Sequence, residues 1–339
     1  MIRLPARSFF ALMLGLICMQ PGRADDAADF YSGRNLNLIV GFNVGGGADL
    51  YARTIARHLG KHMPGQPNII VHNTPGAGSM AAANHIFNVS PRDGSEIGLF
   101  AGNIAVDPVI GGVRTQYDAR QFNWIGAPAS ETAVCLSAKS SSFKTFDDVL
   151  AREMVTGAAG TSTVDFPIAL NSLIGSKFKL VKGYNGSSAL RLALERGEIE
   201  GFCGVGLTSV RSLGLTEDKI NILLQIAGKK NPQLGDVPFA LDYAKTDADR
   251  QVMQLVFGWL IMERPVAAPP DTPASRVKAL RDGFDETMRD PQFVADINNE
   301  SLAFAPMTGA EIAHFVDEVY QTPPAVAKRA AQILGRTEP

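Results

Sequence analysis

Residues that carry metal, redox or nucleic-acid chemistry are scarce in this sequence. Of 339 residues only three are cysteines and five are histidines, and 34 acidic side chains outnumber 32 basic ones. The resulting formal charge of −2 provides no basic surface for nucleic acid or an anionic membrane. His58 and His62 are four residues apart on an expected helix, whose face we expect to be solvated. We therefore expect no nucleic-acid partner, no metal and no cofactor.

The longest apolar run lies at the N-terminus and is too short for a transmembrane helix. Phe9–Met19 follows Arg3 and Arg7, and Gly22–Ala24 offers the small residues of a cleavage site. A basic start, a short apolar run and small residues are typical of a secretory signal peptide. The sequence predicts that residues 1–24 are cleaved and that the protein is periplasmic. An N-terminal membrane anchor and an unstructured start are the alternatives.

Cleavage of the signal peptide would remove Cys18 and leave two cysteines, Cys135 and Cys203. An even pair of cysteines in an oxidising compartment predicts a disulfide. The alternative is two separate buried thiols, which behave as small hydrophobic groups. Neither arrangement leaves a reactive thiolate that would act as a nucleophile.

Two glycine-rich turns are the most informative feature of the sequence. Gly45–Arg53 and Asn73–Ser79 each follow an apolar, β-branched run, at Leu36–Gly41 and Asn68–His72 respectively. Each turn leads into an Ala-rich stretch with helical character. A strand, a glycine turn and a helix N-terminus place free N–H groups and a positive dipole end in one cleft. The arrangement predicts a site that binds a small anion without needing Arg or Lys.

The pattern between residues 36 and 127 alternates strand, glycine turn and helix. Apolar residues with helical spacing predict a helix over 49–61, and buried strands are expected at 36–41, 68–72 and 96–101. A second alternation of the same kind follows residue 153. Parallel units of this kind build doubly wound sheets. The sequence therefore predicts an α/β protein with two similar lobes.

The C-terminal third of the sequence determines how often the chain crosses between the lobes. Residues 255–262 have a strand-like pattern, and three helices are expected at 273–289, 308–320 and 323–334. These helices need a lobe to pack on, and the first lobe is the expected host. Two crossings follow, with residues 29–130 and 256–339 in lobe 1 and residues 131–255 in lobe 2.

Four motifs occur along the chain in the order known from one family of receptors. They are Val44–Arg53, Asn73–Ser79, Pro91–Ile97 and Gly183–Ser187. Together they resemble the Bug family of extracytoplasmic solute receptors of tripartite tricarboxylate transporters, and the resemblance covers nearly all of the mature chain. Val44 stands where the family has Pro, Thr74 stands where Arg is usual, and the cysteine pair is not a general feature of the family.

The resemblance implies a type II periplasmic binding fold, in which two lobes, each a doubly wound sheet flanked by helices, close on a ligand by hinge motion. It implies a small organic carboxylate as ligand, held by backbone amides of both lobes. It also implies delivery of this ligand to the permease subunits of a tripartite tricarboxylate transporter by a monomeric receptor. A ligand-sensing receptor for a two-component signalling system is the alternative.

In the first lobe, the candidates for ligand binding follow the ends of the first three strands, where such folds bind ligands. They are Phe42, Asn43, Gly45, Gly46 and Gly47 in the first turn, Thr74, Gly76, Gly78 and Ser79 in the second, and Asn103 after the third strand. Asp49 has an expected structural role in bracing the turn or capping the helix, because its carboxylate would repel an anionic ligand. A purely structural loop is the alternative for the second turn.

In the second lobe, the candidates lie where the expected helix at 161–174 begins. They are Gly160, Thr161, Ser162 and Thr163, with Tyr184 and Asn185 at the rim and Thr208 and Ser209 after a later strand. Hydroxyls at a helix start serve as caps and as ligand donors, so ordinary capping is the alternative. A bridge between Cys135 and Cys203 would clamp this lobe near the hinge. Trp259 is one of several aromatic residues that would favour a ligand with an apolar body.

Patterns that would indicate an enzyme are weak or incomplete. Gly41–Gly47 lacks the spacing of a dinucleotide fingerprint, and no Walker lysine follows it. Ser141 and Lys144 match a β-lactamase tetrad in form, but the companion motifs are missing. We expect no catalytic residue and no enzymatic activity.

Overall fold

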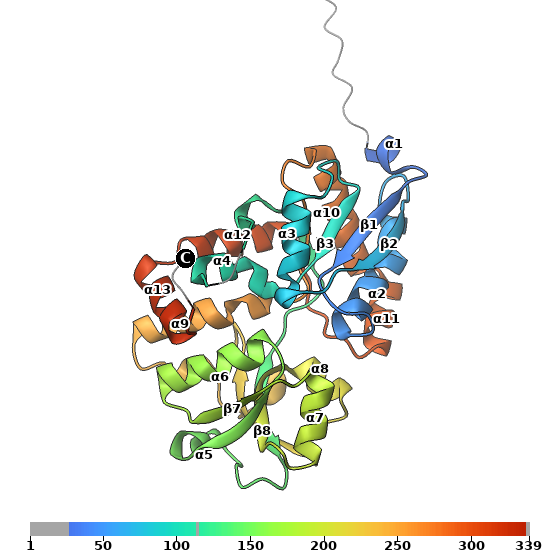
Figure 1. Ribbon diagram of the computed structural model, residues 1–339. Helices are drawn as coiled ribbons and strands as arrows, with labels where there is room; N and C mark the ends of the chain where they lie inside the picture. The colour runs from blue at the N-terminus through green and yellow to red at the C-terminus, as the bar shows by residue number, and fades with distance from the viewer. Residues whose placement is uncertain (1–26, 113–114, 337–339) are drawn as a thin grey trace, which may run out of the picture.

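The computed structural model describes residues 27–112 and 115–336 of the chain. The predicted signal peptide at 1–24, with Cys18, lies outside the described residues. The chain forms two lobes, each built on one mixed sheet that is flanked by helices (Figure 1). The predicted two-lobed α/β fold is confirmed. No helix in the described residues has the length and apolar character needed to cross a bilayer.

The first lobe contains a six-stranded sheet in the order β11-β4-β10-β3-β1-β2. Its strands are β1 (Asn35–Val40), β2 (Asn68–Asn73), β3 (Glu96–Leu99), β4 (Asn123–Ala127), β10 (Val266–Ala268) and β11 (Met307–Thr308). β1, β2 and β3 are parallel, whereas β10 runs antiparallel between β3 and β4. The carboxyl ends of the parallel strands therefore meet at one edge of the sheet, where the glycine-rich turns follow.

Helices cover both faces of this first sheet. One face packs against α2 (Gly47–His62), α10 (Ala274–Arg289) and α11 (Pro291–Asn299), through residues such as Ile55, Leu280 and Phe293. The short helix α1 (Ala27–Tyr31) extends this layer. The other face packs against α3 (Met80–Asn88), α4 (Asp107–Ile110) and α12 (Gly309–Tyr320) (Figure 1). The inner strands β1, β3, β4 and β10 are thus largely buried, as their continuous apolar runs require, whereas the edge strand β2 is only partly buried.

The second lobe contains a five-stranded sheet in the order β7-β6-β8-β5-β9. Its strands are β5 (Ala133–Ala138), β6 (Met154–Ala158), β7 (Phe178–Lys182), β8 (Gly201–Gly206) and β9 (Ile220–Ile226). β6, β7 and β8 are parallel, and β5 is antiparallel to both of its neighbours. The helices of this lobe are α5 (Phe146–Ala151), α6 (Thr161–Ile174), α7 (Ser187–Glu195) and α8 (Leu207–Ser212). Each of α6, α7 and α8 directly follows a parallel strand or its loop, as in a doubly wound lobe.

Helices α9 (Asp247–Phe257) and α13 (Pro324–Ile333) lie between the lobes and pack against α6 and each other (Figure 1). Phe166 of α6 contacts Phe257 edge to face, with ring centroids 4.8 Å apart, and Trp259 at 5.7 Å. These rings belong to one hydrophobic cluster that extends from the first lobe into the second. The lobes therefore share a continuous apolar core on this side of the molecule.

The expected strand at 255–262 is wrong, because this segment is the end of α9 and a 3-10 turn, η6 (Gly258–Ile261). The apolar run is buried on several sides, so its sequence shows no clear period. The helix start carries a capping signal that was missed, since the Thr246 hydroxyl accepts from the Asp249 N–H. Four helices rather than three end the chain, and α11 is the additional one.

The two segments that connect the lobes pair with each other through their backbones. The Glu131 N–H donates to the Leu260 carbonyl at 2.8 Å, and the Glu263 N–H donates to the Ala129 carbonyl at 2.8 Å. We call residues 128–132 and 259–265 the crossover segments. The lobe boundaries at 130/131 and 255/256 stay a prediction, and they fall in or near these segments.

The face of α2 that carries His58 and His62 is not solvated, contrary to expectation. His58 is only 7% exposed, and its Nε2 lies 2.9 Å from Asp296 Oδ2 of α11. His62 Nε2 lies 3.0 Å from Asp290 Oδ2 at the start of α11. The missed helix α11 is the reason, because it covers this face. No cluster of three or more potential metal ligands occurs within the described ranges.

Cys135 and Cys203 form the predicted disulfide. They lie opposite each other on β5 and β8, with Cα atoms 3.8 Å apart, and both are fully buried. The bridge joins positions 68 residues apart in sequence, so it restricts a long loop of the unfolded chain. It cross-links the antiparallel strand of the second lobe to the centre of its sheet.

Replacing both cysteines by Ala should lower the free energy of unfolding by about 3 to 4 kcal/mol, because the unfolded chain regains its loop entropy. Urea denaturation of the two proteins measures the difference. A reductant should lower the midpoint of the wild type and leave that of the double variant unchanged. Equal stability of the two proteins under oxidising conditions would contradict the expectation.

Candidate functional site

A cavity of about 290 Å³ lies between the two lobes, and we call it the cleft. The first lobe contributes Phe42, Gly78 and Asn103 to its lining, and the second lobe contributes Gly160–Thr163 together with Gly186, Ser187 and Ser209. The crossover segments form its floor, with Glu131, Trp259, Glu263 and Arg264 among the lining residues. The cleft thus combines the carboxyl ends of parallel strands from both lobes, where α/β folds bind ligands.

Gly78 brings the second glycine-rich turn into contact with the opposite lobe. It has a φ of +64°, and a Cβ at this position would lie 3.2 Å from Thr161 Oγ1. A side chain here would be strained and would crowd the entrance to α6. Glycine at position 78 thus favours the close approach of the turn to the start of α6.

The first glycine-rich turn is organised by Asp49. Asn43, Gly45, Gly46 and Gly47 are not among the residues that line the cleft. The buried Asp49 carboxylate accepts hydrogen bonds at 2.9 Å from Gly45 N, Asn73 Nδ2 and Arg53 Nε. Burial alone would raise the pKa of Asp49, but hydrogen bonds from Arg53, Gly45 and Asn73 leave it below its ordinary value. This geometry supports the expected bracing role of Asp49.

Of the second turn, Gly78 lines the cleft whereas Thr74, Gly76 and Ser79 do not. Ser79 is 1% exposed and has a φ of +82°, which is unfavourable for any residue with a side chain. Its Oγ lies against Gly41 and has no hydrogen-bond partner in the described part of the chain. Ser79 is thus a strained, buried residue beside the cleft rather than a lining residue.

In the second lobe, α6 begins at the cleft. As in every α-helix, the first N–H groups of α6 have no partner within the helix. Its N-cap residue Gly160 has no side chain that could accept a hydrogen bond from them. The Thr163 hydroxyl accepts a hydrogen bond from Ala159 N at 2.7 Å and donates one to Gly160 O at 2.9 Å. Both hydrogen bonds of this hydroxyl are therefore made within the turn. Thr161 and Ser162 line the cleft at the positive end of the helix dipole.

Helix α7 also begins at the cleft, with Gly186 as an N-cap that provides no side-chain hydrogen bond. Tyr184 and Asn185 are not part of the lining. The Tyr184 ring instead packs near Gly157 within the second lobe, where a Cβ at Gly157 would lie 3.2 Å from its Cε2. Two helices therefore begin at the same cavity, and the first N–H groups of a helix have no partner within the helix itself.

The floor of the cleft carries three charged side chains, Glu131, Glu263 and Arg264, that were missed in the sequence. Arg264 Nη1 donates to Glu263 Oε2 at 2.6 Å, and its guanidinium lies 4.9 Å from the Phe42 ring centroid. The expectation that the site binds an anion without needing Arg or Lys stays a prediction, although Arg264 lines the cleft. The available signal was a Glu-Arg pair that interrupts an apolar segment just before Pro265.

Glu131 is the titratable group of the cleft with the largest change in pKa. Burial, and to a smaller extent the charge of Glu263, raises the pKa of Glu131 to about 7. Hydrogen bonds from Thr208 and from the Thr132 N–H oppose this rise. Glu131 is therefore partly protonated at neutral pH.

A buried ion-pair network supports Asn103 from behind and connects the lobes. Asn103 Nδ2 donates to Asp107 Oδ2 at 2.7 Å, and Arg336 donates to Asp107 Oδ1 at 2.9 Å and to Asp165 Oδ2 at 2.5 Å. Asp165 belongs to α6 of the second lobe. Burial raises the pKa of Asp107 and of Asp165, and the Arg336 charge opposes this. The Arg336 guanidinium thus offsets the free-energy cost of burying the carboxylates of Asp107 and Asp165.

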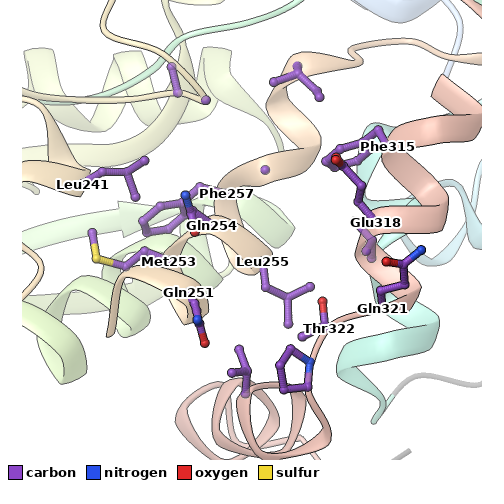
Figure 2. Close-up of a pocket in the computed structure, with 17 residues that line it drawn as sticks. Leu241, Gln251, Met253, Gln254, Leu255, Phe257, Phe315, Glu318, Gln321 and Thr322 are labelled. Carbon is purple, nitrogen blue, oxygen red and sulfur yellow. The ribbon is translucent and has the colours of Figure 1, made fainter. Parts of the chain in front are cut away.

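A second cavity, of about 530 Å³, lies between α9, η6, α12 and α13 (Figure 2). In Figure 2, Phe315 and Glu318 of α12, with Gln321 just after it, lie opposite Leu255 and Gln251 of α9. Its walls are mainly apolar, and α13 begins there with Pro323 and Pro324, which have no N–H to donate. The amide groups that line this cavity include the side chains of Gln251, Gln254 and Gln321.

Comparison with known proteins finds similarity to one curated protein along nearly the whole chain, and the same fold in solved periplasmic binding proteins. No family model matches the chain. A UPF0065 protein from the gbd 5' region of Cupriavidus necator is 24% identical over 328 residues, which cover 93% of this chain and 92% of that protein. The predicted resemblance to the Bug family is confirmed.

Three solved structures share the fold at low sequence identity. The periplasmic binding protein BugD has a TM-score of 0.68 at 18% identity and covers 91% of this chain and 100% of its own. An R. palustris protein with adipate has a TM-score of 0.67 at 19% identity, covering 91% and 99%. MatC from Rhodopseudomonas palustris with bound malate has a TM-score of 0.64 at 18% identity, covering 89% and 99%.

Replacing Glu131 by Gln should change how stability depends on pH. The pKa of Glu131 is about 7 in the folded protein and 4.5 as the ordinary value, so its contribution is fully present below pH 4.5 and is lost as the pH rises through about 7. Gln does not titrate, so the variant does not lose this stability as the pH rises. It should be more stable than the wild type at pH 8, by up to about 3 kcal/mol. Urea denaturation at pH 5 and pH 8 measures this, and parallel pH profiles would contradict it.

Replacing Arg336 by Gln should lower the free energy of unfolding at pH 7 by about 3 kcal/mol, because two buried carboxylates lose their cation. The loss should be smaller at pH 5, since the raised pKa values favour protonated Asp107 and Asp165. Arg191→Gln is the control, because its exposed ion pair with Glu195 should contribute less than about 0.5 kcal/mol. Equal losses in the two variants would contradict the buried role of Arg336.

Proposed function

We propose that this protein is a periplasmic receptor that captures a small organic carboxylate between its lobes and delivers it to a transporter of the tripartite tricarboxylate type. The observation that carries the proposal is the convergence of two uncapped helix N-termini, those of α6 and α7, on a cavity between the lobes. Such N-termini bind anions through N–H groups and the helix dipole.

The size of the cleft agrees with a small ligand. A cavity of about 290 Å³ is at the lower end of the range for small-molecule sites, which begins at roughly 300 Å³. Phe42 and Trp259 provide apolar walls, while the helix N-termini provide donors. Solved structures of the same fold contain adipate and malate, which supports a carboxylate as the ligand class.

Closure of the lobes is the proposed mechanism, and it needs no chemical step. The lobes approach each other at Gly78 and Thr161, and they are joined at the crossover segments. A ligand bound to both lobes would stabilise the closed arrangement by its differential affinity for it. The closed monomer would then be recognised by permease subunits. The alternative role, presenting the same closed form to a two-component sensor, stays a prediction.

A thermal-shift screen of the purified protein against mono-, di- and tricarboxylates, acidic amino acids and aromatic acids tests the ligand class. A ligand at about 100 times its Kd should add about 2.7 kcal/mol of stability, which gives a clear rise in Tm. Mass spectrometry of the denatured protein detects a carboxylate that was already bound. The absence of both a shift and a bound carboxylate would contradict the proposal.

Replacing Thr161 by Pro tests the backbone N–H directly, because Pro is tolerated at the first helical position but has no N–H. Gly160 before it is extended, as the residue before a Pro must be. We expect this variant to bind the acid identified in the screen at least tenfold more weakly, from the loss of about 1.5 kcal/mol in a charge-assisted hydrogen bond. Thr161→Val keeps the N–H and is the matched control. Equal affinities of the two variants would exclude this N–H as a donor.

A further inference from the structure

We propose that Arg264, on the floor of the cleft, binds a carboxylate group of the ligand directly, and that Glu263 is the residue that positions it. This inference rests on the proposed function and deepens it by naming the side chain that gives the cleft its preference for acids. It adds a cation from the crossover segment to the backbone donors of the second lobe. The ligand class that follows is a small acid with one carboxylate end at the floor and a second polar end at α6 and α7.

The first argument is position. Arg264 lines the same cavity as Phe42 and Asn103 from the first lobe and Thr161 from the second. The backbone hydrogen bond from Glu263 N to Ala129 O fixes the segment just before it. Arg264 is the only basic side chain that lines the cleft within the described residues. An anion in the cavity therefore meets one cation, and that cation is held at the junction of the lobes.

The second argument is backbone conformation. Arg264 has a φ of +61°, a value that costs free energy for any residue with a Cβ. Glycine would avoid this cost, yet the position carries a long, charged side chain. Strained residues of this kind cluster at ligand-binding sites, where the surrounding structure maintains them. With this conformation both residues line the cavity, and Glu263 is buried there.

The third argument is the hydrogen bonding of the guanidinium. Nη1 donates to Glu263, and the Phe42 ring lies against the group at 4.9 Å. Nε is buried and has no hydrogen-bond partner anywhere in the described ranges. An Arg presents two edges that suit a carboxylate, and Glu263 occupies only the Nη1 side. The edge formed by Nε and Nη2 is therefore the one that a ligand carboxylate would occupy.

The fourth argument is the balance of charge at the floor. Glu263 and Glu131 line the same cavity as this single guanidinium, so the three groups together have no excess positive charge. The pair of Glu263 and Arg264 would be neutral without a ligand, and an incoming carboxylate shares the cation with Glu263. Like charges disfavour each other at short range, so Glu263 opposes the ligand even while it positions Arg264. The two residues should therefore have opposite effects on affinity.

The test is isothermal titration calorimetry of the purified full-length mature protein and its variants with succinate, malate, adipate, butanoate and hexanoate. Arg264→Gln should weaken binding of the acids that the wild type binds by at least about tenfold, because a charge-assisted hydrogen bond is lost. Arg264→Lys keeps the charge without the planar edge and should lose less. Glu263→Gln should strengthen binding by about threefold, because it removes an opposing carboxylate.

The controls separate this inference from the proposed function and from misfolding. Arg191→Gln, an exposed arginine of α7, should bind like the wild type. Thermal unfolding without ligand shows whether each variant folds. If Arg264→Gln does not fold, the affinity of Arg264→Lys provides the test instead. Unchanged affinity of a folded Arg264 variant, or equal weakening by Arg264→Gln and Glu263→Gln, would overturn the inference alone. No binding of any acid to the wild type, with no carboxylate released on denaturation, would overturn the proposed function and this inference together.

Discussion

The backbone pairing of the two crossover segments is the constraint on which the arrangement of the molecule depends. Hydrogen bonds between Glu131 and Leu260 and between Glu263 and Ala129 hold together two stretches that are far apart in sequence. Residues 128–132 join β4 of the first sheet to β5 of the second. Residues 259–265 join α9, which follows the second sheet, to β10 of the first. The orientation of both sheets, and the charged floor between them, follows from this short antiparallel pairing.

The two sides of the hinge differ in how firmly they connect the lobes. On one side, α6, α9 and α13 share a continuous apolar core, and Arg336 ties Asp107 to Asp165 across it. On the other side, the lobes meet at a glycine turn and at helix N-termini that leave a cavity. A hinge motion of the lobes that keeps the buried junction intact would therefore widen the cleft at the glycine turn.

Most of the fold could be predicted because strands and helices alternate with clear glycine and proline boundaries. The segment at 255–262 could not, because it is apolar on every side and its helix start lies in a polar stretch before it. The turns around Gly78 and Gly160 could be placed at the cleft from the position of the parallel strands alone. Glu131 and Arg264 could not, because only the tertiary pairing of the crossover segments brings them together. The burial of Ser79 against Gly41 could not be predicted either, because that contact also forms only in the folded protein.

The place of β10 in the first sheet has a consequence for the order in which the chain acquires its structure. β10 lies between β3 and β4, so these two strands cannot be joined into one sheet until residues 266–268 have been synthesised, and the edge strand β11 follows only at residues 307–308. The second lobe takes all its strands from the continuous stretch between residues 133 and 226 and needs no later segment for its sheet. The lobe that begins the chain is therefore the last whose strands are all synthesised. With the periplasmic location proposed above, the Cys135–Cys203 bond would form only after export, in the oxidising compartment.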